Sequence, residues 1–110
     1  KTVPVELDKP RRLRFDINAL ADLEETLGVG LGAMLQQHVG VRVLRAMLWA
    51  GLKWEDPGLT LQRAGKLLQD YLSGGGDLDT LAEKLIEALM ASGLLGKGDN
   101  PNADEAEAAS

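Results

Sequence analysis

The sequence predicts a mainly α-helical fold: a small bundle of about five helices with an N-terminal β-hairpin and a disordered acidic C-terminal tail. Leucine recurs at helical spacing in several segments, and glycine or proline separates these segments. Apolar and polar side chains alternate over residues 2–15, which is the period of a strand. Residues 96–110 are acidic and hold no large apolar side chain, a composition typical of disorder. We therefore expect one helical domain over residues 1–95, including the hairpin, followed by the tail.

The composition excludes several classes of protein. The 110 residues include no cysteine, which excludes a disulfide scaffold, a thiolate zinc site and a cysteine nucleophile. Without residues 96–110 the chain holds 13 acidic and 11 basic groups and is nearly neutral, so general nucleic-acid binding is disfavoured. Residues 1–20 show no signal-peptide pattern, and no apolar run is long enough to cross a membrane. We expect neither a nucleic-acid partner nor a membrane.

The alternating residues 2–15 predict two short strands around a turn at 8–11. Pro4 has no N–H to donate to a ladder, so its strand should lie at a sheet edge. A lone hairpin is marginally stable in water, so it should pack on the helices or pair with another chain. Three arginines (Arg11, Arg12 and Arg14) have no interleaved aromatic side chains for stacking on RNA, and we interpret them as a solvated strand face.

The most apolar run, residues 43–54, predicts a central helix that carries both tryptophans. It is apolar nearly all round, which indicates burial by neighbours on several sides. We expect it to begin by Val41 or Arg42 and to stop before Pro57, because the residue ahead of a proline is pushed out of helical geometry.

The other helices follow from their caps and apolar stripes. Asp16 or Asn18 should begin the first helix and Gly28 should end it, and a short second helix should cover 31–39. Thr60 should cap the fourth helix, and Gly65 should allow it to approach the central helix closely. Asp77 or Asp79 should cap the last. The face of the first helix should consist of Ile17, Leu20, Leu23 and Leu27.

No motif indicates catalysis, a cofactor or a metal ion. The alternating glycines of residues 28–32 follow a predicted helix and precede no lysine-serine/threonine pair, so they do not form a phosphate loop. His38, the one histidine, has no companions at the spacing of a metal site or a serine–histidine arrangement. Carboxylates are abundant, but an acid–base pair also needs a cleft that perturbs one of them. We expect a protein that is not an enzyme.

Three stretches carry a family resemblance. Residues 13–28 are a strand running into an acidic amphipathic helix, residues 45–52 are the centre of the apolar helix, and residues 55–61 join helices through a proline and a capping threonine. In this order and spacing, over about residues 3–90, they resemble the tail assembly chaperones of long-tailed bacteriophages and the related gene-transfer-agent proteins.

The resemblance implies a protein of the host cytoplasm that is absent from the mature virion. Such chaperones bind the tape measure protein and keep it soluble while tail tube protein subunits polymerise around it. A translational frameshift near the end of the gene gives a longer form, and this chain would be the short form. Residues 96–97, Gly-Lys, lie where a slippery codon pair would be placed.

Binding a helical partner requires apolar surface, and aromatic residues and methionine are enriched in such contacts. The candidate partner-binding residues are Trp54, Trp49, Met47, Met34 and Leu31. Because the two tryptophans are about 140° apart on a helix, we expect Trp49 in the monomer core and Trp54 in a subunit or partner contact. The hairpin edge and the apolar helix surface also favour self-association into a homo-oligomer. Two alternative functions stay open: a structural tail or neck subunit retained in the particle, and a helical DNA-binding regulator. The regulator is the least favoured, since its recognition helix would be strongly apolar.

Overall fold

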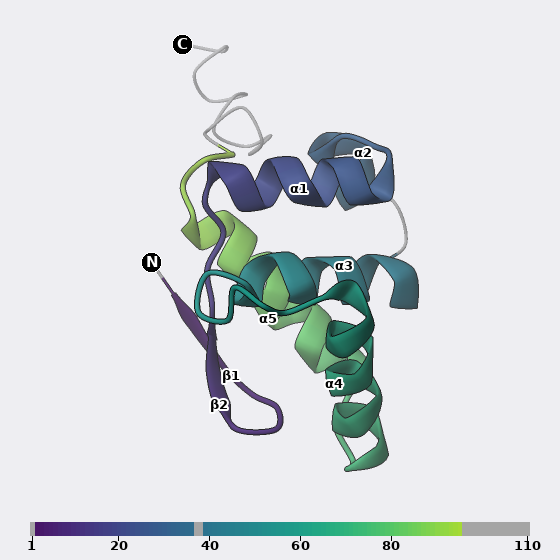
Figure 1. Cartoon of the computed structure of the whole chain (residues 1–110). Coiled ribbons are helices and arrows are strands. Elements are labelled where there is room, and N and C mark those ends of the chain that lie inside the picture. Colours follow the sequence, from purple (N-terminus) through teal and green to yellow (C-terminus); the bar gives the residue numbers. More distant parts are fainter. Residues whose placement is uncertain (1, 37–38, 96–110) are drawn as a thin grey trace, which may run out of the picture.

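The computed structural model describes residues 2–36 and 39–95, so His38 and the expected tail at 96–110 lie outside the described residues. Two strands precede five helices, and the predicted fold class is confirmed (Figure 1). The strands pair as an antiparallel hairpin. The bounds are β1 Val3–Glu6, β2 Pro10–Leu13, α1 Ile17–Leu27, α2 Leu31–Gln36, α3 Val41–Leu52, α4 Leu61–Ser73 and α5 Leu78–Ala91.

Helix α3 is the centre of the fold, as the sequence predicts. It contacts α1, α4, α5 and β2, and it has apolar residues on several faces to meet them. Burial of a leucine-sized side chain stabilises the fold by about 1.5–3 kcal/mol, so this helix contributes a large share of the hydrophobic stabilisation. Its side chains with no exposed surface are Leu44, Met47, Leu48 and Leu52.

Helix α3 is shorter than expected, and Trp54 lies beyond its end. The last helical residue is Leu52, with Lys53 as C-cap. The N–H groups of Glu55 and Asp56 both turn back to the Leu52 carbonyl at 3.1 Å, so the chain leaves the helix well before Pro57. The angle of 140° between the tryptophans therefore does not apply, because only Trp49 is helical.

The predicted caps are confirmed. Side-chain oxygens of Asp16, Thr60 and Asp77 accept hydrogen bonds from the backbone N–H three residues later, at 2.8, 3.1 and 2.9 Å. Gly28 ends α1 with φ 75°, the left-handed conformation that favours glycine. The expected apolar face of α1 is wrong at Ile17, which is 64% exposed. Phe15 already fills the core ahead of this helix, and the buried stripe begins only at Ala19.

The hairpin packs on the helices through the buried side chains of Val3, Val5 and Leu13. Its turn is tighter than expected, since Pro10 and Arg11 already belong to β2. Arg11 lies opposite Val5, and opposed residues in a ladder share one face. Arg11 is consequently 6% exposed, and the interpretation of this arginine as part of a solvated face is wrong.

Carboxylates compensate the buried charge of Arg11. Its Nε lies 2.7 Å from Asp8 Oδ1, and its Nη1 lies 3.6 Å from Asp56 Oδ2 in the loop after α3. The hydrogen bond from Arg11 lowers the pKa of Asp8 below its ordinary value of 3.8, and the same bond raises the pKa of Arg11. This cluster holds the hairpin against the α3–α4 loop.

Among residues 2–36 and 39–95, no helix is long and apolar enough to span a membrane.

Candidate functional site

The five candidate partner-binding residues do not form one surface. Met34 is 2% exposed and Met47 is fully buried, so the structure places both in the core and not on the surface expected for a partner contact. Unbranched, adaptable methionine side chains suit irregular core gaps, and here they fill the core. Leu31 is half-buried against the core, and its backbone N–H donates to Glu24 Oε2 at 2.8 Å.

Trp49 packs against the core, as expected, and its polar edge is satisfied inside the molecule. The indole Nε1 donates to the Leu59 carbonyl at 3.1 Å, which ties α3 to the residues just before α4. The Lys53 ammonium lies 4.5 Å from the centroid of the ring and also pairs with Asp22 on α1. Trp49 is therefore a half-buried core residue that joins α3 to the residues before α4, and its ring lies beside the Lys53–Asp22 pair.

Trp54 retains surface, with 37% of it exposed, but it is also an intramolecular contact. Its Nε1 donates to the Arg12 carbonyl at 3.0 Å, and the Arg14 guanidinium lies 5.6 Å from the ring centroid, within the range of a cation–π contact. The Glu55 carboxylate accepts the Arg12 N–H at 3.4 Å. The loop after α3 thus covers the outer edge of β2.

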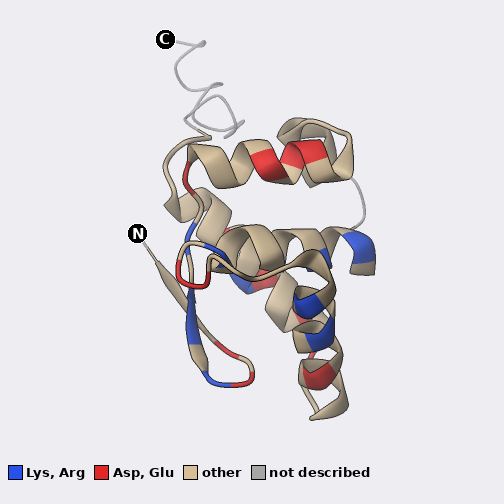
Figure 2. Ribbon diagram, in the orientation of Figure 1, with Lys and Arg blue, Asp and Glu red and all other residues tan. Residues whose placement is uncertain are grey.

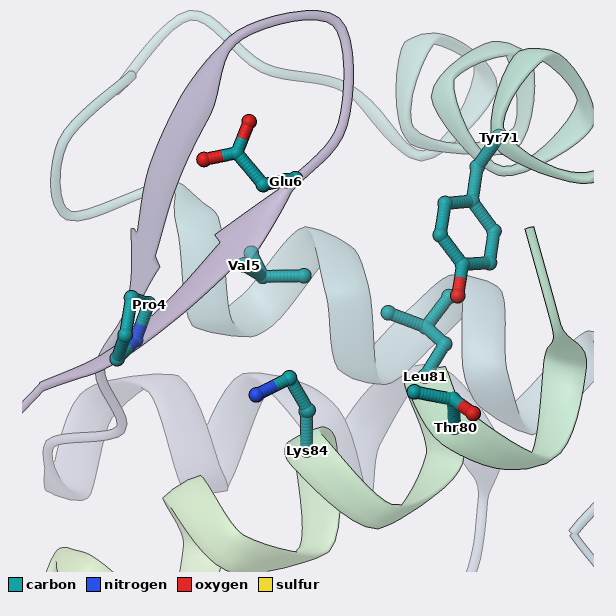
Figure 3. A pocket seen from close by; sticks show the side chains of 7 residues that line it. All are labelled: Pro4, Val5, Glu6, Tyr71, Thr80, Leu81 and Lys84. Atoms are coloured by element: carbon teal, nitrogen blue, oxygen red, sulfur yellow. The ribbon is translucent and has the colours of Figure 1, made fainter. Parts of the chain in front are cut away.

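An apolar groove opens on the other side of the hairpin, where no sequence motif drew attention to it. Its cavity volume is about 380 Å³, at the small end of the range for ligand pockets. The close-up in Figure 3 shows β1 along one side and the side chains of α4 and α5 opposite it. The lining residues are Pro4, Val5, Glu6, Tyr71, Thr80, Leu81 and Lys84.

Tyr71, at the end of α4, is a fixed wall of the groove. Its hydroxyl donates to the Asp77 carbonyl at 2.9 Å and accepts the Asp77 N–H at 3.1 Å, across the α4–α5 turn. A Cβ at Gly76 would lie 2.5 Å from the ring, so the turn needs glycine at this close approach. The Thr80 hydroxyl and N–H both bond to the Asp77 carboxyl and lower its pKa, which keeps the α5 cap charged.

The floor of the groove is apolar and its rim carries charge. Val5 and Leu81 are buried at the bottom, whereas Glu6 is exposed and Lys84 half-buried at the edges. In the part of the chain that the structure describes, neither charge has an ion-pair partner. The same part contains no group of three or more histidine, aspartate and glutamate residues placed to hold a metal ion. The groove is suited to binding an apolar side chain next to a charged group.

A second hollow of about 400 Å³ lies at the turn end of the hairpin, lined by Lys9, Pro10, Arg11, Glu55 and Asp56. Its charged groups of opposite sign largely compensate one another, because Arg11 already pairs with Asp8 and Asp56. We interpret this hollow as part of the structural ion-pair cluster.

Comparison with models of known protein families, with curated proteins and with solved structures gave no significant match.

Proposed function

We propose that this protein is a tail assembly chaperone, the short form of a frameshifted pair, which binds and solubilises a tape measure protein while the tail tube protein assembles around it. The proposal starts from the resemblance carried by residues 13–28, 45–52 and 55–61. The observation that supports it in the structure is the apolar groove between β1, α4 and α5. A holdase needs preformed apolar surface that remains accessible in its own folded state, and the groove is such a surface.

The size of the groove fits a weak and reversible contact. Burying one leucine-sized side chain contributes about 1.5–3 kcal/mol, and each 1.4 kcal/mol is a factor of about ten in affinity. One groove by itself therefore binds loosely. Several copies along one long partner would each bind and dissociate independently, so arriving tube subunits would displace them one at a time. In this proposal the chaperone acts in the host cytoplasm and leaves before the virion is complete.

The charge distribution argues against the DNA-binding alternative. That alternative needs α3 free to enter a DNA groove, but four elements enclose α3. Of its basic groups, Arg42 donates to the Leu27 carbonyl at 3.0 Å and Lys53, its C-cap, pairs with Asp22. Figure 2 shows basic residues at the start of α3 and on α4, and acidic residues on the neighbouring α1. A phosphate backbone on this side would meet charges of both signs.

Co-expression with the long helical protein encoded beside it tests the function. The wild-type chain should co-purify with that protein and keep it in the soluble fraction. Tyr71→Ala removes one wall of the groove and should reduce the captured amount, whereas Tyr71→Phe keeps the ring and should retain capture. The proposal would be overturned if the wild-type chain neither co-purified with that protein nor kept it in the soluble fraction.

Mass spectrometry of purified particles separates the chaperone from a structural subunit. The chaperone should be absent from particles and present in the lysate of producing cells. A stoichiometric amount in particles would support a tail or neck subunit instead.

A further inference from the structure

The hydrogen-bonding pattern of the hairpin leaves backbone groups of β1 directed at the groove. Pro4 lies opposite Arg12, whose N–H and C=O both bond outside the ladder, to Glu55 and Trp54. Bonded and non-bonded pairs alternate along an antiparallel ladder. Val3 and Val5 therefore bond to β2, and Pro4 and Glu6 turn their backbone groups to the outer edge.

The sheet thus has one covered edge and one open edge. Trp54 and Glu55 cover Arg12 on β2, and the Arg14 N–H donates to the Gly51 carbonyl at 2.9 Å. Within β1, the outward groups are the Glu6 N–H and the carbonyls of Pro4 and Glu6. Figure 3 shows that the side of β1 away from β2 faces Tyr71, Leu81 and Lys84.

A bound segment in extended conformation can hydrogen-bond to the outward backbone groups of β1, whereas a bound helix cannot. A helix bonds its own backbone internally, so a helix lying in the groove would cover the Glu6 N–H and the Pro4 carbonyl without pairing them. Burying an unpaired backbone group costs about 1–3 kcal/mol. A strand would donate to and accept from these same groups.

Lys84 favours a negatively charged side chain on the bound segment. Its ammonium points toward β1 near Pro4 and Val5 in Figure 3, and it has no ion-pair partner among residues 2–36 and 39–95. A carboxylate on the occupant would pair with it at the rim. Side chains on one face of a strand are two residues apart, so the matching segment has an apolar and an acidic residue at that spacing.

From these observations we infer that β1 takes an extended segment of the tape measure protein as a third strand, with an apolar side chain in the groove and a carboxylate at Lys84. The inference rests on the proposed function and names the recognised part of that partner. Pro4 removes one donor from the edge, which keeps the added strand short and limits edge-to-edge aggregation of the free protein.

The test compares Glu6→Pro with Glu6→Ala in co-purification with the co-expressed tape measure protein. Glu6→Pro removes the outward N–H and places a ring at the edge, while Glu6→Ala keeps the N–H and removes only the carboxylate. We expect Glu6→Pro to weaken binding about tenfold and Glu6→Ala to bind like the wild type. Lys84→Gln should weaken binding about threefold and reduce its salt dependence. Thermal melts establish that each variant is folded.

Hydrogen exchange of the unmodified complex gives a second measurement that needs no variant. The outward Glu6 amide of β1 should become protected when the tape measure protein is bound, whereas the Val3 and Val5 amides already bond to β2. Equal capture by both Glu6 variants together with unchanged exchange at β1 would overturn the third strand while leaving the chaperone function intact. Failure of the wild-type chain to capture the partner would overturn both. If protection of β1 in the isolated protein increased with protein concentration, a second copy of this chain would be the added strand, and that result would also contradict the inference.

Discussion

Gly51→Ala tests whether the hairpin is pressed against α3 as closely as the structure indicates. Gly51 is the second-last residue of α3, and a Cβ built there would lie 2.9 Å from Phe15 Cζ and 3.1 Å from Leu13 Cδ2. Phe15 is 3% exposed and Leu13 is fully buried, so both side chains lie in the core, where close packing resists their movement. The added methyl group must therefore push the hairpin and the helix apart.

Two opposing effects set the magnitude. Alanine is favoured over glycine inside a helix by up to about 1 kcal/mol, and by less near a helix end. Overpacking a rigid core costs about 1–3 kcal/mol. The second effect is larger at Gly51, so we expect the free energy of unfolding to fall by about 1–2 kcal/mol.

Gly65→Ala is the matched control. Its Cβ would lie 3.1 Å from Arg45 Cδ, but Arg45 is an exposed and flexible side chain that can shift. The helix gain then dominates, and we expect a stabilisation of about 0.5 kcal/mol. Urea titrations followed by tryptophan fluorescence measure both changes, and about 1 kcal/mol corresponds to roughly 4–8 °C in Tm for a domain of this size. A Gly51→Ala protein as stable as Gly65→Ala would refute the close packing of the hairpin on α3.

Three further predictions concern the contacts that hold the hairpin. Arg11→Ala should lower the free energy of unfolding, measured by urea titration, by about 2 kcal/mol. This loss is smaller than for a fully buried ion pair, because water can hydrate Asp8 and Asp56 once the arginine is gone. Arg11→Met should recover part of the loss. The lowered pKa of Asp8 means that the unfolded state binds this proton more tightly, so Asp8→Asn should be less stable than the wild type above about pH 5. That difference should shrink as the pH falls through and below 3.8, and a difference independent of pH would contradict the assigned ion pair. Trp54→Ala should lower Tm because it removes both the bond to the Arg12 carbonyl and the ring beside Arg14, and Trp54→Phe, which loses the bond but keeps a ring, should lower it less. An unchanged Tm for both variants would return Trp54 to the partner surface.

Local signals in the sequence predicted the existence of the helices and most of their caps. A capping side chain bonds to the N–H three residues along the chain, so Asp16, Thr60 and Asp77 cap their helices as predicted. The left-handed conformation that ends α1 depends only on the backbone of Gly28 itself, and this prediction is also confirmed. The apolar residues of α3 likewise identified it as the central helix, because a helix with few polar faces must be covered by neighbours.

The wrong predictions concern side chains whose surroundings come from distant segments. Met34 and Met47 belong to a residue type that is enriched in binding surfaces, but the tertiary packing buries both side chains in the core. Arg11 was expected in water, and register with Val5 turned it inward, where Asp56 from another loop compensates its charge. None of these placements follows from residues nearby in the chain.

The sequence by itself determined the fold class, the order of the elements, the central place of α3 and the residues that begin and end most helices, since each depends on interactions within a few residues or on one periodic pattern. Only the tertiary structure decided which apolar residues remain accessible and where the groove lies. Its lining comes from residues 4–6, 71, 80, 81 and 84, which are brought together because β1 packs on α5 while the α4–α5 turn holds Tyr71 beside them. The open edge of β1 also depends on a contact far along the chain, because Trp54 and Glu55 cover β2 and leave β1 as the free strand.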